Sequence, residues 1–200
     1  MRLEDCATIR TGLVLSRKEA SSIESDETFK NKALNLKAVT AAGEILPSLF
    51  DDYYAIEKLK LEYFTHENDV IVRLSSPYTA TLITAELEGI LIPSHFAIIR
   101  PDIKKIVPKY LCWLLNRENM KNRIAKNISG SAILGTISSG FFAGLTLKDI
   151  PIEKQHQIAE ITKLSESECK LINKLIEQKE ILTRQATEQI YRGTKRGNGI

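Results

Sequence analysis

The sequence predicts an α+β fold, in which a mostly antiparallel sheet is followed by one long C-terminal helix of coiled-coil type. Two observations predict it. Short strand-like segments bounded by turn residues occupy the first half of the chain and helical segments follow, an order typical of α+β domains. After Pro151 the chain runs to about Tyr191 without Gly or Pro, several times the ordinary helix length of about 11–12 residues. We therefore expect a globular domain over residues 1–150, a long helix over 151–192 and a flexible basic tail over 193–200.

The first half of the chain holds strand signals of uneven strength. Alternating apolar and polar residues between turn residues predict a strand. A first strand is expected at Asp5–Arg10, before a polar, charged stretch at 16–31, and a second at Ala33–Thr40, which closes on the Ala42-Gly43 turn. The segment 47–63 fits both helical turns and irregular packing, so its structure stays open.

Clearer signals begin at Asp69. Apolar runs bounded by turn residues predict strands, at Val70–Val72, Thr79–Ala85 and Phe96–Ile99, with a turn at Ser75–Pro77. Pro108 marks a helix start, because the missing N–H of proline costs nothing in a first turn, and this helix is expected to run to about Lys126. A loop rich in Ser and Gly over 127–144 precedes the segment 145–150 that leads to the long helix.

The long helix carries apolar residues at steps of three and four, which place them on one face and predict a coiled-coil seam. Polar residues on a seam weaken an interface but fix its register and orientation, and four occur here, Glu168, Gln178, Gln185 and Gln189. An amphipathic helix that lies on its own domain is the alternative. The expected dimer or partner interface consists of Gln155, Ile158, Ile161, Leu164, Leu171, Leu175 and Leu182.

Composition limits the class of protein. The 200 residues are 43% hydrophobic, enough for one core, and the formal net charge is +3. The charged N-terminus, Met1–Asp5, precedes no apolar stretch, so we expect no signal peptide, and nothing approaches the roughly 18 apolar residues of a membrane span. The isolated cysteines, Cys6, Cys112 and Cys169, fit reduced thiols in the cytoplasm rather than disulfides or a zinc site.

The most tempting catalytic motif is Ser75-Ser76-Pro77-Tyr78. It is similar to the polar–Pro–Pro–aromatic loop that holds the flipped base in adenine amino-methyltransferases. Ser76 replaces the first proline, however, and no Gly-rich strand–turn–helix is present to bind S-adenosylmethionine, so Pro77 is interpreted as an ordinary turn residue. His66, His95 and His156 are dispersed, which disfavours a metal site. We expect no catalytic residue, cofactor or metal in this chain.

Basic residues gather between Arg100 and Lys126, where eight of them against two acidic residues give a net charge of +6. Such a stripe can neutralise DNA phosphates, although a solvated helix face would carry the same charges. Arg117 and Lys121 are four apart and are expected to share a helix face. Hydroxyl and amide groups in two loops suit phosphate or base-edge contacts. The candidate DNA-binding residues are Arg73, Ser75, Ser76, Tyr78, Thr79, Lys104, Lys105, Arg117, Lys121, Arg123, Lys126, Asn127, Ser129 and Ser131.

Four segments, in order, resemble the DNA specificity subunit of type I restriction–modification systems. Leu3-Glu4-Asp5, followed by a short strand and Gly12, is similar to the family's Leu-Gly-Asp opening. Asn68-Asp69-Val70-Ile71 resembles its Gly-Asp-Ile-Leu segment, and Gly130-Ser131 its Gly-Ser stretch. The most specific segment is Pro151-Ile152-Glu153-Lys154-Gln155-His156-Gln157-Ile158, which resembles Pro-Leu-Glu-Glu-Gln-x-x-Ile at the head of the family's spacer helix. Glu4 and Asn68 replace glycines, so the local turns are expected to differ there.

Family members usually hold two target recognition domains and two spacer helices, whereas this chain resembles a half-subunit with one of each. The resemblance implies that residues 1–150 form a target recognition domain, which reads half of a bipartite site in double-stranded DNA. It implies a homodimer with antiparallel helices that reads a palindromic, interrupted site. The implied partners are a DNA methyltransferase subunit and a restriction subunit, which would supply all catalysis and bind S-adenosylmethionine and ATP, in the cytoplasm of a prokaryote at the nucleoid.

Two alternatives stay open at this point. A coiled-coil adaptor, whose globular head binds protein rather than DNA, fits the imperfect seam and the mild net charge. A truncated remnant of a longer specificity subunit would carry the same sequence features.

Overall fold

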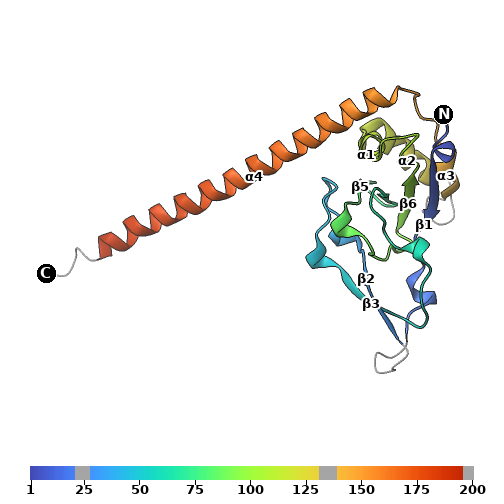
Figure 1. Ribbon diagram of the computed structural model, residues 1–200. Helices are drawn as coiled ribbons and strands as arrows, with labels where there is room; N and C mark the ends of the chain where they lie inside the picture. Colours follow the sequence, from blue (N-terminus) through green and yellow to red (C-terminus); the bar gives the residue numbers. More distant parts are fainter. Residues whose placement is uncertain (21–27, 131–138, 196–200) are drawn as a thin grey trace. The chain divides into compact units, whose positions relative to one another are not determined.

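The computed structural model describes residues 1–20, 28–130 and 139–195 (Figure 1). The chain divides into two compact units, Met1–Ala159 and the residues from Glu160 onward. The first unit is a globular domain, and the second continues the long helix α4 (Ile152–Lys195). The predicted α+β class, with an antiparallel sheet and a long C-terminal helix, is confirmed.

A four-stranded antiparallel sheet forms the centre of the domain. Its strands lie in the order β1-β6-β4-β5 and span Ala7–Thr11 (β1), Phe96–Pro101 (β6), Val70–Arg73 (β4) and Ala80–Leu82 (β5). Arg73 pairs with Phe96, while Ala7 pairs with Pro101. The start of β6 therefore lies beside the turn that joins β4 to β5, and the end of β6 lies at the opposite end of the sheet, beside the start of β1.

Both faces of this sheet are covered. Alternation along each strand sends successive side chains to opposite faces. On one face lie Val70, Val72, Ala97 and Ile99 with the core residues of the helices, and on the other lie Ile71, Phe96 and Ile98 with residues of the connecting loops. Burial on both faces explains why β4 and β6 read as continuous apolar runs and were predicted from the sequence.

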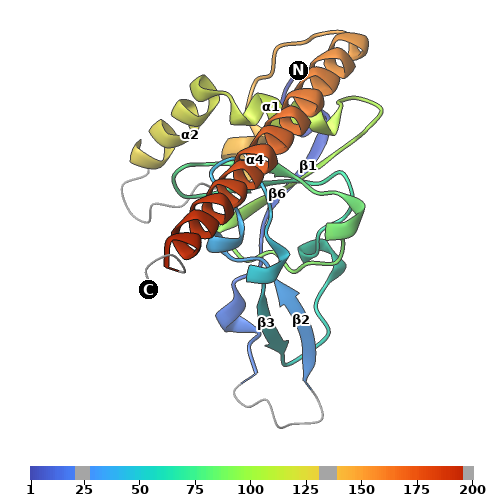
Figure 2. The same cartoon turned by 90° about the vertical axis from the view of Figure 1, so that its left-hand side faces the viewer.

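A second, two-stranded antiparallel sheet pairs β2 (Phe29–Ala33) with β3 (Asp51–Ala55). It lies at the end of the domain away from the helices α1 and α2 (Figures 1 and 2). β3 occupies part of the segment 47–63 whose structure the sequence left open, and β2 includes residues of the stretch that was expected to be merely polar.

The predicted strand Ala33–Thr40 is wrong, because β2 ends at Ala33. The reason is Asn35. Its Oδ1 accepts hydrogen bonds from the backbone N–H groups of Lys37 and Ala38, both at 2.9 Å. A side chain that binds the backbone this way offers the chain an alternative to a sheet ladder, and here it starts a short 3-10 turn at Leu36–Ala38.

The single helix expected from Pro108 to about Lys126 consists of two helices, α1 (Pro108–Asn116) and α2 (Glu118–Gly130). They are separated by Arg117, whose ψ of 140° is extended. The carbonyl of Arg117 then accepts the N–H of Met120 at 2.9 Å and that of Lys121 at 3.0 Å, which starts α2. Arg117 and Lys121 therefore do not share the face of one helix.

Part of the loop expected over 127–144 is helical. Residues 127–130 belong to the last turn of α2, and α3 covers Ser139–Ala143. Asn127 and Ser129 thus lie on a helix, while Ser131 lies outside the described residues. After α3 the chain returns to the N-terminus, where Leu3 donates its N–H to the Leu145 carbonyl at 2.9 Å.

Helix α4 begins after Pro151, whose carbonyl accepts the N–H groups of Lys154 at 3.0 Å and Gln155 at 3.1 Å. It continues to Lys195 and so includes the first residues of the expected tail, 193–195. Residues 196–200 lie outside the described part of the chain. Across the ranges that the structure describes, no helix is both long enough and apolar enough to cross a bilayer.

Candidate nucleic-acid interface

The turn between β4 and β5 (Ser75–Thr79) carries two exposed hydroxyls. Tyr78 donates its N–H to the Ser75 carbonyl at 2.9 Å. Its φ is 55°, in the left-handed region that bulky residues rarely adopt. Strained residues of this kind concentrate at binding and active sites. Because Ser75 and Ser76 are exposed on this turn, their hydroxyls are available to a ligand.

Arg73 braces the Ser75–Thr79 turn from the end of β4. Its Nε donates to Oγ of Ser75 at 3.2 Å, and its Nη1 donates to the carbonyl of Leu36 at 3.4 Å. A guanidinium has five N–H donors, so Arg73 can hold the turn in place and still bind an acceptor. The bond to Leu36 also joins this turn to the segment that follows β2.

Thr79 does not belong to a DNA-binding surface, contrary to the prediction. Its side chain is buried, with 1% exposure, and its hydroxyl donates to the carbonyl of Ala41 at 3.4 Å. Thr79 therefore connects the loop around Ala41 to β5 and has no surface to offer a partner.

Asn116, the last residue of α1, brings the junction between α1 and α2 to the same end of the sheet. Its Oδ1 accepts the N–H of Ala80 at 3.0 Å, and its Nδ2 donates to the Ala80 carbonyl at 2.7 Å. The amide thus pairs with the edge strand β5 much as another strand would. Asn116 was not among the predicted site residues, because an asparagine at a helix end carries no sequence signal for so distant a partner.

Basic residues follow Asn116 at Arg117 and along α2. Arg117 is exposed, and its guanidinium stacks over the Trp113 ring at 5.3 Å. In α2, Met120 and Ile124 face the core. At 100° per residue, Lys121 and Arg123 fall on opposite flanks of that buried face, and Lys126 points nearly away from it. These cations do not form the single stripe that was predicted.

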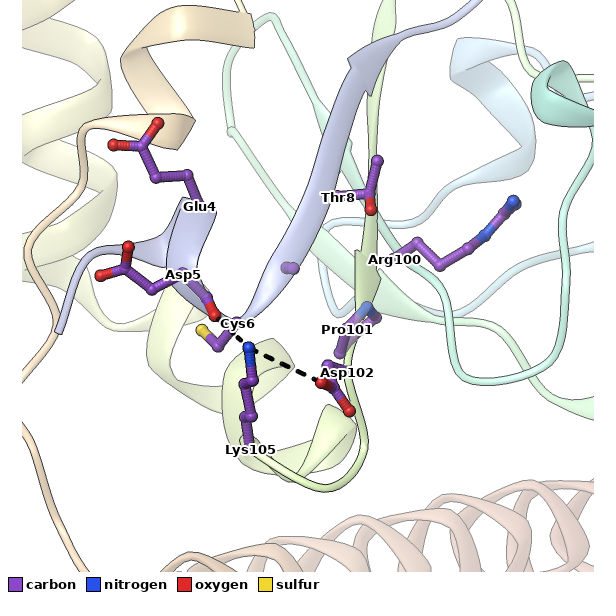
Figure 3. Close-up of a pocket in the computed structure, with 9 residues that line it drawn as sticks. Glu4, Asp5, Cys6, Thr8, Arg100, Pro101, Asp102 and Lys105 are labelled. Atoms are coloured by element: carbon purple, nitrogen blue, oxygen red, sulfur yellow. Dashed lines mark hydrogen bonds and ion pairs between the residues drawn. The ribbon is translucent and has the colours of Figure 1, made fainter.

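Lys104 and Lys105 lie at the opposite end of the sheet, after the end of β6. Since β6 spans six residues, roughly 20 Å separates its two ends. Lys105 donates its Nζ to the Asp5 carbonyl at 2.9 Å and lies 3.8 Å from the Asp102 carboxylate (Figure 3). The structure therefore does not bring Lys104 and Lys105 together with the Ser75–Thr79 turn.

The open pocket beside Lys105 has a volume of about 320 Å³. Figure 3 shows Glu4 and Asp5 at one side of it and Asp102 at the other. Three carboxylates against Arg100 and Lys105 make this pocket unsuited to phosphate, because like charges disfavour binding of an anion.

Arg100 contributes little to the positive charge of this region. It forms a bidentate pair with the fully buried carboxylate of Asp69, with Nε–Oδ1 and Nη2–Oδ2 distances of 2.8 Å. Hydrogen bonding to Asp69 raises the pKa of the Arg100 guanidinium. Asp69 also accepts the N–H of His66 at 2.9 Å, so this acid organises the turn that precedes β4.

The two positions where the chain departs from glycine are now explained. Asn68 has a φ of 70°, the left-handed conformation that glycine adopts freely and that Asn tolerates better than other residues. Asn68 can therefore take this left-handed turn at a lower cost than most other residues could. Glu4 lies in a 3-10 turn at Leu3–Asp5, where glycine is not required.

Gln155, expected at a partner interface, is instead buried in its own domain at 4% exposure, so it is not available to a partner. Ile158 is half-buried against the same core. The other expected interface residues lie beyond the domain boundary and are exposed, namely Ile161, Leu164, Leu171, Leu175 and Leu182.

No family model and no curated protein matches this sequence. Solved structures with the same architecture do exist, and they define the class of fold: an α+β domain joined to a long helix, as found in type I restriction–modification specificity subunits. The resemblance of the sequence to that family is thereby confirmed at the level of the fold.

Two of these structures are as follows. One is the HsdS subunit from Thermoanaerobacter tengcongensis, with a TM-score of 0.65 and 14% identity over 95% of this chain and 46% of that chain. The other comes from work on complex assembly and conformational transition of the type I R-M system, with a TM-score of 0.64 and 14% identity over 95% of this chain and 48% of that chain. This chain therefore spans about half the length of the chains that it matches.

Proposed function

We propose that this chain is a non-catalytic DNA-recognition subunit of the type I restriction–modification kind, with a single target recognition domain. The observation that carries the proposal is the grouping at one end of the sheet. There the exposed turn of Ser75 and Ser76 lies near Arg117, because the Asn116 amide ties the α1–α2 junction to Ala80 beside that turn. The domain that holds this group has the HsdS fold.

The chemistry of the group suits double-stranded DNA. Hydroxyls and a braced guanidinium can donate to base edges, which carry the sequence information, whereas exposed cations bind phosphates and set orientation. Ser75, Ser76 and Arg73 supply the first kind of contact, and Arg117 and Lys121 supply the second. Lys104 and Lys105 are left out of this interface, because they follow the far end of β6.

In this proposal a homodimer supplies two copies of the recognition domain. Two copies related by a two-fold axis would read a palindromic, interrupted site. Methyltransferase and restriction subunits would then supply catalysis, S-adenosylmethionine and ATP. The exposed apolar face of α4 supports a protein partner. It supports a coiled-coil adaptor equally, so the test must measure DNA binding by the globular domain.

The test uses the full chain and a pool of randomised duplexes, with sequencing of the bound fraction at several salt concentrations. The expected result is enrichment of an interrupted palindrome, with an affinity that falls steeply as salt rises. A Ser75→Ala, Ser76→Ala double variant should change the enriched bases and leave the salt slope intact. Weak binding without enrichment, insensitive to salt, would favour the adaptor instead. Methylome mapping in cells that hold a type I methyltransferase subunit, with and without this chain, tests recruitment.

A further inference from the structure

The two faces of the four-stranded sheet bring different segments to the Ser75–Thr79 turn. On one face, Val72 packs with the core residues of α1. On the other face, Ile71 packs with Leu34 and Ala38, which follow β2. We call these the helix face and the loop face. The Ser75–Thr79 turn therefore lies between two covering layers of the domain.

Two side chains hold the segment 36–41 on the loop face at this turn. Alternate side chains of a strand point to opposite faces, and Arg73 points to the loop face. Its Nη1 donates to the Leu36 carbonyl at 3.4 Å, and the Thr79 hydroxyl donates to the Ala41 carbonyl at 3.4 Å. The segment is thus fixed to both arms of the turn.

Lys37 lies in this segment and was not among the predicted site residues. Its N–H donates to Oδ1 of Asn35 at 2.9 Å, so its backbone is held in the 3-10 turn Leu36–Ala38. The side chain is exposed, and within the described part of the chain its ammonium group forms no ion pair. A cation on a fixed backbone, without an acidic partner, is suited to bind an external phosphate.

Arg117 occupies the corresponding place on the helix face. The Asn116 amide binds both the N–H and the carbonyl of Ala80, which brings the next residue, Arg117, beside the same turn. The Arg117 guanidinium is exposed and stacks over the Trp113 ring at 5.3 Å. The turn therefore has one exposed cation on each side, Lys37 from the loop face and Arg117 from the helix face.

The spacing of the two layers suits the major groove of B-DNA. A layer packed on a sheet lies roughly 10 Å from it, so backbone segments on opposite faces are roughly 20 Å apart. The major groove is about 12 Å wide and admits a two-stranded ribbon, whereas the minor groove is only about 6 Å wide. A ribbon end in the major groove would leave its two covering layers next to the two phosphate backbones that border the groove.

We propose that the Ser75–Thr79 turn enters the major groove, where Lys37 binds a phosphate of one strand and Arg117 binds a phosphate of the other. The inference rests on the proposed function and adds the groove, the orientation of the domain and the residue Lys37. Ser75 and Ser76, which are exposed on the turn, then face the base edges. The two cations hold the turn in the groove from both sides.

The first test measures the salt dependence of binding of the full-length chain to a randomised duplex. Lys37→Ala and Arg117→Ala should each reduce the slope of log K against log salt by about 1 for each bound chain, and the double variant by about 2. Thermal unfolding like that of wild type shows that each variant keeps its fold.

Lys60→Ala is the matched control. Lys60 is also exposed and beside a short 3-10 turn, Leu61–Tyr63. The carbonyl of Phe64, which follows that turn, accepts an N–H of Arg100 near the far end of β6. Lys60→Ala therefore removes the same charge away from the Ser75–Thr79 turn and should leave the salt slope unchanged.

The second test uses duplexes of the enriched site in which single methylphosphonate linkages remove one phosphate charge at a time. Wild type should lose affinity at positions on both strands. Lys37→Ala should become insensitive at a position on one strand, and Arg117→Ala at a position on the other. Purines without N7, an acceptor of the major groove, should weaken binding several-fold between these positions. Inosine in place of guanine, which removes the amino group of the minor groove, should not.

The outcomes separate this inference from the proposed function. A wild-type salt slope for Lys37→Ala, in a chain that still enriches an interrupted palindrome, would overturn the role of Lys37 and leave DNA recognition standing. Loss of sensitivity on the same strand for both variants would overturn the two-sided arrangement. Sensitivity to inosine alone would show a turn in the minor groove and reject the proposal. A chain that binds no duplex would overturn this inference and the proposed function together.

Discussion

Gln155 joins α4 to α1 through Val107. Its Oε1 accepts the N–H of Val107 at 3.0 Å, and its Nε2 donates to the Ile150 carbonyl at 3.1 Å. Val107 is the N-cap residue of α1, and both it and Gln155 are buried. One amide therefore fixes the first turn of the long helix to the domain core.

We expect Gln155→Ala to lower the free energy of unfolding of the domain by about 1–3 kcal/mol. The substitution leaves the buried Val107 N–H without an acceptor, and an unsatisfied buried donor carries this cost. Urea unfolding followed by circular dichroism measures the change. The control is Gln157→Ala, at an exposed position on the same helix turn, which should stay within about 0.5 kcal/mol of wild type. Equal stability of the two variants would contradict the bridging role of Gln155.

Substitutions at Asn68 should separate backbone conformation from side-chain identity. Its φ of 70° favours glycine. Asn68→Gly should therefore change the free energy of unfolding by less than about 0.5 kcal/mol, whereas Asn68→Ala should lower it by about 1 kcal/mol. Thermal or urea unfolding distinguishes these outcomes. Alanine and glycine variants of the same stability would mean that the left-handed backbone is not retained.

Gly12 is expected to tolerate no side chain. A Cβ there would lie 2.2 Å from the carbonyl oxygen of Pro93 and 2.4 Å from that of Ile92. Gly12→Ala should therefore cost about 2–3 kcal/mol of stability, since backbone atoms must move. The matched substitution Gly193→Ala, which meets nothing within 4 Å in α4, should increase helicity. A Gly12→Ala domain as stable as wild type would disprove the close approach.

Elements whose sequence pattern arises from their own burial were predicted correctly, whereas features that depend on contacts between distant residues were not. β4, β6 and α4 were predicted because their apolar patterns arise from burial of the element itself. β2 was missed, because its residues Lys30, Asn31 and Lys32 lie on a two-stranded ribbon and carry no core pattern. The break at Arg117 depends on Asn116 reaching Ala80, 36 residues earlier in the chain. Contacts over such separations leave no local sequence signal, so the arrangement of the candidate interface could not be predicted.

Lys121 tests the candidate interface, and Lys104 serves as its control. Lys121→Ala should weaken binding to all duplexes alike and reduce the slope of log K against log salt by about 1, the loss of one phosphate contact. Lys104→Ala removes the same charge at the far end of β6 and should leave the slope unchanged. Fluorescence anisotropy over a series of salt concentrations measures both. A larger change of the salt slope for Lys104→Ala than for Lys121→Ala would show that DNA binds at the far end of β6.

The thiols should differ in reactivity. Burial, followed by the charge of Asp5, raises the pKa of Cys6 above its ordinary value of 9.0, and Cys169 is exposed. Because the thiolate is the reactive form, Cys169 should react with a disulfide reagent at about pH 8 on the order of tenfold faster or more than Cys6. The raised pKa also means that the contribution of the Cys6 thiol to stability is complete below its unfolded pKa and is lost as pH rises through the folded value.

That labelling experiment has an internal control. In urea all cysteines should react at similar rates, and Cys169→Ser should remove the fast phase from the folded protein. Rapid modification of Cys6 in the folded chain would contradict its burial.

The placement of Gln155 and Ala159 inside the domain has a consequence for how the chain can vary in length. The first two turns of α4 are locked to the core, so the angular phase of every later residue is set there. One residue inserted after Ala159 would rotate the remainder by about 100° and advance it by about 1.5 Å. Seven residues would advance it by about 10.5 Å with almost no rotation. Functional variants of this chain should therefore lengthen or shorten α4 by whole heptads.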